Sequence, residues 1–105
     1  MSKLSRLRQS RREILGHIAS IEEMRRGSVV RQLFKVKTNG KARKRGPYAL
    51  YTRKKQGKTV GRRLRRPEEI SRLEAQVENY HVFRDLCSEL VNVAERICEE
   101  KEKEL

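Results

Sequence analysis

Lysine and arginine are the residues whose number and spacing could do chemistry in this chain. Residues 24–66 hold seventeen of them and no Asp or Glu, whereas residues 1–23 carry a net charge of +2 and residues 67–105 a net charge of −6. A surface that meets phosphate groups gains from excluding carboxylates, because each carboxylate would repel the ligand. The middle segment is therefore the candidate working surface, and nucleic acid is the partner that we expect, with DNA favoured over RNA.

Two basic clusters and the strand residues between them form the expected nucleic-acid-binding site. The first cluster would lie on a polar loop over residues 39–46, and the second at the end of a strand before Pro67. Each has a plainer interpretation, as a disordered loop tip or a solvated strand end. Phosphate contact is the favoured one, and the sequence does not distinguish phosphate contacts from base contacts. The predicted set is Lys41, Arg43, Lys44, Arg45, Tyr48, Arg53, Lys54, Lys55, Lys58, Arg62, Arg63, Arg65 and Arg66.

Other residues with chemical potential do not form a site. Gly57-Lys58-Thr59 is similar to the end of a phosphate-binding loop, but no Gly stands five positions before Gly57 and a strand follows, so it predicts a hairpin turn. His17 and His81 lack a nearby carboxylate or Cys cluster. Cys87 and Cys98 would lie about 16 Å apart along one helix, too far to share a metal or a disulfide. We therefore expect no enzymatic activity and no metal or cofactor. The two unpaired cysteines also fit a reducing compartment.

Tyr48 and Tyr51 stand among these cations and could stack on bases, as aromatic residues of single-strand binders do. Half of any small sheet faces a core, however, so packing is the favoured interpretation for the pair, with one of the two rings left exposed.

Size and composition favour one small domain. The 105 residues have a hydrophobic content of 35% and a net charge of +13, which supports only a modest core. No run of eighteen apolar residues occurs, and residues 1–12 lack the apolar stretch of a secretory signal. We therefore expect a soluble protein without membrane contact, located in the cytoplasm, with association with the nucleoid as an open alternative.

Two helices are predicted at the ends of the chain. Leu4, Leu7, Ile14, Ile18 and Ile21 form an apolar stripe that predicts a helix over residues 3–25. A second stripe predicts a helix over residues 67–100, which begins at a proline followed by two glutamates; residues 101–105 would be a frayed acidic tail. Antiparallel pairing would bury both stripes, and self-association of the longer helix is the competing arrangement.

The residues between the helices predict a basic antiparallel β-meander over 27–66. Strands are expected at 27–38, 47–55 and 58–64, with turns at Asn39-Gly40 and Gln56-Gly57. A two-residue turn at Gln56-Gly57 would pair Arg53 with Val60 and Tyr51 with Arg62. Ala49, Tyr51, Val60 and Leu64 would then share one face, and Tyr48, Leu50, Thr52 and Arg63 the other. The predicted fold is α+β, in which an antiparallel stalk of two long helices flanks a three-stranded sheet.

Several short motifs resemble an uncharacterised family of small bacterial and archaeal proteins, some of which are named transposases or are found beside them. The motifs are GSVV at residues 27–30, GPYALYTRKKQGKTVGRRL at 46–64 and ENYHVFRDLCSEL at 78–90. The matching positions are Gly46, Pro47, Tyr48, Gly57, Lys58, Thr59, Asn79 and Tyr80. Relatives place several Cys before the Gly-Pro-Tyr, and this chain has none there, so a metal knuckle is not carried over. The resemblance implies a fold and a mobile-element context, and it assigns no catalytic residue.

Two functions fit these observations. The first is a non-enzymatic protein that binds DNA or RNA phosphates through a basic sheet and loop, as an accessory to a mobile-element or other nucleic-acid-processing system. The alternative is a protein-interaction module whose long helix docks on a partner or forms a homodimer, and whose charge serves solubility.

Overall fold

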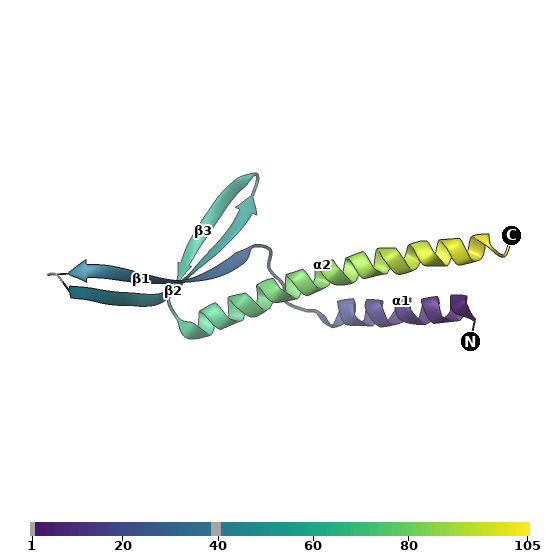
Figure 1. Ribbon diagram of the computed structural model, residues 1–105, viewed down its shortest axis with the longest axis horizontal. Helices are drawn as coiled ribbons and strands as arrows, with labels where there is room; N and C mark the ends of the chain where they lie inside the picture. Colours follow the sequence, from purple (N-terminus) through teal and green to yellow (C-terminus); the bar gives the residue numbers. More distant parts are fainter. Residues whose placement is uncertain (1, 39–40) are drawn as a thin grey trace. The chain divides into compact units, whose positions relative to one another are not determined.

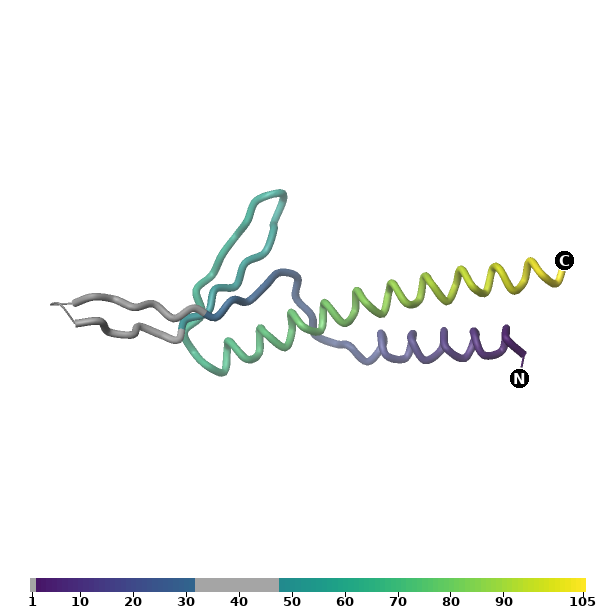
Figure 2. The backbone as a smooth tube through the Cα atoms, in the orientation of Figure 1, coloured from purple at the N-terminus to yellow at the C-terminus, as the bar shows by residue number. Residues whose placement is uncertain are grey.

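The computed structural model describes the backbone of residues 2–38 and 41–105 and the side chains of residues 2–31 and 48–105. Figure 2 traces the path of the chain through its Cα atoms. Two helices and a three-stranded antiparallel sheet confirm the predicted α+β class. The chain divides into two compact units, which we call the helical unit (residues 1–23 and 79–105) and the basic unit (residues 24–78). Each is described by itself, and the expectation of a single domain stays a prediction.

The helical unit pairs α1 (Lys3–Ser20) with the second half of α2 (Pro67–Glu102), and the two helices run antiparallel (Figure 1). Ser2 caps α1 by accepting a hydrogen bond from the Ser5 amide at 3.1 Å. At one end of the pair, Lys3 Nζ lies 3.4 Å from Glu100 Oε1. At the other end, Asn79 Nδ2 donates to the Glu23 carbonyl at 2.9 Å. The predicted antiparallel pairing is confirmed.

The first helix is shorter than predicted, because it ends at Ser20 and not at residue 25. Ile21 has an extended backbone, and its amide donates to the Ile18 carbonyl at 3.1 Å. Ser20 Oγ donates to the His17 carbonyl at 2.6 Å, so two carbonyls of the last turn have partners without further helix. The apolar stripe runs on through Ile21, which is why periodicity overestimated the length.

The basic unit holds the sheet, in which β2 (Lys41–Lys55) lies between β1 (Ser28–Thr38) and β3 (Lys58–Leu64) (Figure 1). The register pairs Arg53 with Val60 and Tyr51 with Arg62, as predicted. Gln56 and Gly57 both have positive φ, at 52° and 79°, which is the backbone of a two-residue hairpin turn that matches the twist of its strands. The turn therefore sets the alternation of side chains along both strands.

The predicted loop over residues 39–46 is wrong for most of its length, because β2 begins at Lys41 and residues 41–46 belong to the strand. Pairing with β1 stabilises this part of the strand through backbone hydrogen bonds, although its basic residues have little preference for strands. The predicted turn at Asn39-Gly40 lies outside the described residues.

The core of the basic unit joins one face of the sheet to the first half of α2. Tyr51 is buried, which confirms packing for this ring, and its hydroxyl donates to the Arg26 carbonyl at 2.5 Å. Val60, predicted to share this face, remains 45% exposed. The buried cluster consists of Ala49, Tyr51, Leu64, Ile70, Leu73 and Val77.

The helical unit is less tightly packed. Leu7 and Ile14 are its buried apolar residues among those described, each 9% exposed, and Leu86 of α2 is only half-buried. Across the described part of the chain, neither helix is long and apolar enough to cross a membrane.

Candidate nucleic-acid interface

Strand alternation sorts the cations of the basic unit onto two faces of the sheet. We call the face that packs on α2, with Ala49, Tyr51 and Leu64, the inner face. The opposite or outer face has a backbone register that brings Val30 beside Leu50 and Leu50 beside Arg63. Neighbouring residues of a strand point to opposite sides, so adjacent cations of the sequence serve different surfaces. The described residues of the outer face include Val30, Tyr48, Leu50, Thr52, Lys54 and Arg63.

Two inner-face arginines, Arg31 and Arg62, are paired with carboxylates of α2. Arg31 makes two contacts with Glu74, at 2.6 Å from Nη2 and 3.1 Å from Nε. Arg62 Nη2 lies 3.2 Å from Glu69 Oε1. The hydrogen bond from Arg31 lowers the pKa of Glu74, against an opposing effect of desolvation. The positive charge of these two arginines is therefore partly neutralised within the basic unit.

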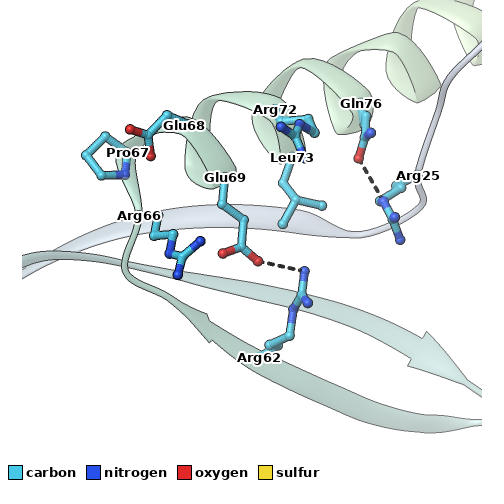
Figure 3. Close-up of a pocket in the computed structure, with 9 residues that line it drawn as sticks. All are labelled: Arg25, Arg62, Arg66, Pro67, Glu68, Glu69, Arg72, Leu73 and Gln76. Atoms are coloured by element: carbon cyan, nitrogen blue, oxygen red, sulfur yellow. Dashed lines mark hydrogen bonds and ion pairs between the residues drawn. The ribbon is translucent and has the colours of Figure 1, made fainter.

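A cavity of about 910 Å³ opens at the start of α2 (Figure 3). Figure 3 shows Arg62 reaching Glu69, and Arg25 Nε donating to Gln76 Oε1 at 2.7 Å. Glu68 and Glu69 stand in the first turn of α2, where they already complement the positive end of the helix dipole. These carboxylates would repel a further anion, so this cavity is a weaker candidate for a phosphate site than a cavity without carboxylates. Its lining residues are Arg25, Arg62, Arg66, Pro67, Glu68, Glu69, Arg72, Leu73 and Gln76.

A smaller cavity of about 270 Å³ shares two of these arginines. Arg25, Arg53 and Arg62 line it together with Tyr51, and no carboxylate is among its lining residues. Arg53 is exposed and makes no ion pair with a described carboxylate. This cavity is more cationic than the larger one, although Arg62 is shared with Glu69.

The β2–β3 hairpin and the outer face hold the cations that α2 does not neutralise. Lys54, Lys55 and Lys58 are exposed around the turn, and within the described residues no carboxylate forms an ion pair with them. Arg63 and Arg65 are also exposed, and their guanidinium carbons lie 5.4 and 5.9 Å from the centre of the Tyr48 ring. We call these five cations the outer cation set; Lys54 and Arg63 belong to the outer face, whereas Lys55 and Lys58 lie beside the turn on the opposite side of the strands.

The structure thus divides the predicted site residues. Arg62 and Arg63 are neighbours in one predicted cluster, yet Arg62 is paired on the inner face and Arg63 lies over Tyr48. Arg66 lines the larger cavity. The roles of Arg25 and Arg31 were missed, because their partners Gln76 and Glu74 lie over forty residues away in the sequence and no local pattern signals such contacts. The side chains of Lys41, Arg43, Lys44 and Arg45 lie outside the described set.

The remaining residues with chemical potential behave as isolated groups. Cys87 is half-buried, Cys98 is exposed, and both are free thiols. Among the described side chains, no group of three His, Cys, Asp or Glu could hold a metal ion. Lys58 begins β3 directly after the Gln56-Gly57 turn, which confirms that the Gly-Lys-Thr motif closes a hairpin.

The resemblance noted above, over residues 27–30, 46–64 and 78–90, stays a prediction, and function must be inferred from how the side chains are arranged. No protein-family model matches the chain, and no similar chain is found among curated proteins or solved structures.

Proposed function

We propose that this protein is a non-enzymatic nucleic-acid-binding protein that contacts phosphates through the outer cation set, with DNA as the favoured ligand. The observation that carries the proposal is the unequal pairing of cations in one small sheet. Arg31 and Arg62 have carboxylate partners on the inner face, whereas the outer cation set has none among the described residues. Charges left unpaired on the outer face and around the hairpin turn are available to an external anion.

The distribution of charge between the two units supports the same function. The basic unit holds eighteen Lys and Arg against four acids, for a net charge of +14, and the helical unit has a net charge of −1. Charge spread for solubility alone would have no reason to gather in one unit. Phosphate binding does require this concentration, because the release of condensed counterions scales with the number of phosphates contacted together.

An accessory role in a mobile-element or other nucleic-acid-processing system is the biological context that we favour. It is supported by the resemblance of residues 46–64 and 78–90 to proteins found beside transposases. The predicted site also includes Lys41, Arg43, Lys44 and Arg45, whose side chains lie outside the described set.

Duplex binding measured against salt concentration tests the proposal. If roughly five to eight phosphates are neutralised, log affinity should fall against log salt with a slope of about −5 to −7. Fluorescence anisotropy of a labelled duplex with the nuclease-treated full chain gives this slope. Absence of binding at low salt, or a slope shallower than about −2, would remove the proposal and leave the protein-interaction module as the better function.

Two matched triple variants separate a binding surface from mere net charge. Changing Lys54, Lys55 and Lys58 to Gln should weaken duplex binding by on the order of 100-fold and make the slope shallower by about 3. Changing Arg6, Arg8 and Arg11 of α1 to Gln removes the same charge from exposed positions of the helical unit, and should change affinity by less than about 3-fold. Equal losses in the two variants would show that the hairpin is not the contact surface.

A further inference from the structure

Tyr48 is the aromatic residue among the described side chains of the outer face. It lies on the central strand β2, is half-buried, and is therefore partly open to solvent, unlike the buried Tyr51 on the inner face. Arg63 and Arg65 bring their guanidinium groups to 5.4 and 5.9 Å from the ring centre. A planar ring and two cations consequently occupy one small area of the sheet, and a guanidinium plane is itself a surface on which bases stack.

Apolar side chains extend this area across the sheet. Val30 of β1 is 51% exposed, and its cross-strand partner Leu50 is half-buried. Leu50 in turn pairs with Arg63 of β3. At about 3.4 Å per residue, Tyr48 and Lys54 mark out roughly 20 Å of the central strand on this face. The outer face therefore combines an aromatic ring, apolar side chains and cations along one extended strip.

The combination distinguishes between forms of nucleic acid. A duplex presents phosphates and sugars and keeps the faces of its bases stacked inside, so it can use the cations but not the ring. An unpaired strand presents both phosphates and the flat faces of its bases. Exposed apolar and aromatic surface beside cations is what such a strand needs.

A second Tyr–Arg pair in the chain shows which part of the pattern matters. Arg84 lies 6.0 Å from the ring centre of Tyr80 on α2, so the same contact occurs within the helical unit. Asp85 and Glu89 follow there on the same helix, and the unit has a net charge of −1. Tyr80 has the ring and the arginine without the basic sheet, which makes it a matched control for Tyr48.

We propose that the outer face around Tyr48 binds single-stranded nucleic acid by stacking unpaired bases on the Tyr48 ring and on the guanidinium groups over it, while the neighbouring cations hold the phosphates. This rests on the proposed nucleic-acid function and specifies its ligand. The site prefers a single strand to a duplex, and it accepts different bases because every base has a flat face.

Three labelled probes test this with the full-length protein: an oligothymidine, an oligonucleotide of the same length built from stable abasic residues, and a duplex. The wild-type protein should bind oligothymidine about 5- to 150-fold more tightly than the abasic strand, as expected for stacking of a base on an aromatic side chain. Tyr48→Leu should remove most of that difference and leave binding of the abasic strand and the duplex within about 2-fold of wild type. Tyr48→Phe and Tyr80→Leu should both retain it.

The outcomes separate this inference from the function beneath it. If wild type binds all three probes but does not distinguish oligothymidine from the abasic strand, or if Tyr48→Leu retains the discrimination, base stacking at Tyr48 is wrong and phosphate binding stands. If no probe binds at low salt, both are wrong. The comparison of probes on the wild-type protein needs no substitution, so it can still overturn base stacking if Tyr48→Leu fails to fold, and Tyr80→Leu with retained discrimination then excludes the other Tyr–Arg pair.

Discussion

The helical unit and the basic unit differ in where they place their apolar side chains and their charge. The helical unit is almost neutral, and its buried residues among those described are two side chains of α1, each at the margin of burial. The basic unit has a net charge of +14 and yet contains a cluster in which Ala49, Leu64 and Ile70 are each 1% exposed. The unit under the stronger internal repulsion has the better core, so its charge is tolerated by packing and not by ion pairs alone.

The largest difference that we predict concerns core substitutions in the two units. Ile70→Ala should lower the free energy of unfolding by about 2–5 kcal/mol, because the side chain is fully buried and leaves a cavity. Leu86→Ala should cost less than about 2 kcal/mol, because that side chain is only half-buried between the helices. Urea unfolding followed by circular dichroism gives both values. Equal costs would mean that the two units share one level of packing, and would break the comparison.

The glycines of the two units should respond to alanine with opposite signs. Gly27 has φ +120°, and an added Cβ would clash with the Thr52 carbonyl oxygen, so Gly27→Ala should destabilise by about 1–3 kcal/mol. Gly16 lies inside α1 with open space around it, so Gly16→Ala should stabilise by about 0.5–1 kcal/mol. Thermal melts of the two variants report the sign directly. A stabilised Gly27→Ala variant would contradict the close approach of β1 to β2 at Thr52.

The smallest effect concerns the pH dependence of the Arg31–Glu74 pair. The pKa of Glu74 is below its ordinary value of 4.5 in the folded protein, so the pair contributes stability above that pH and loses it as pH falls through the lowered pKa. Glu74→Gln should therefore lower the melting temperature slightly at neutral pH and reduce the further loss on acidification. Glu78→Gln, one turn along the same helix and in none of the ion pairs formed by the described side chains, is the control. Parallel acid profiles for wild type and Glu74→Gln would show that the pair contributes nothing measurable.

Local sequence signals predicted the parts of the fold that local chemistry determines. The Gln56-Gly57 turn gave the correct register of β2 and β3, because a two-residue hairpin allows one pairing of the strands around it. Pro67 with the two following glutamates gave the correct start of α2. The basic segment at 41–46 was wrongly predicted as a loop, because its strand is formed by pairing with β1 and the cations themselves have no strand preference.

The sequence predicted which segment carries the basic residues of the site, but not how their side chains are arranged. Counting cations identified the basic unit, and alternation along the strands separates Arg62 from Arg63. What the sequence could not show is that α2 places Glu69 and Glu74 against the inner face, since those contacts depend on how the helix packs on the sheet. The five cations of the outer cation set could be identified only after the structure showed which neighbouring arginines form ion pairs with carboxylates of α2.

The residue pair beside the turn of the β2–β3 hairpin links the stability of the hairpin to the anions around it. Lys55 and Lys58 are direct cross-strand partners, which brings their Cβ atoms to within about 5 Å, and like charges so placed destabilise a hairpin. A polyanion seated between the two ammonium groups removes that repulsion, so occupancy and hairpin stability are thermodynamically linked and each raises the other. The thermal stability of the hairpin therefore depends on the ions in solution. The repulsion between the two lysines is strongest in dilute buffer, and multivalent anions suppress it.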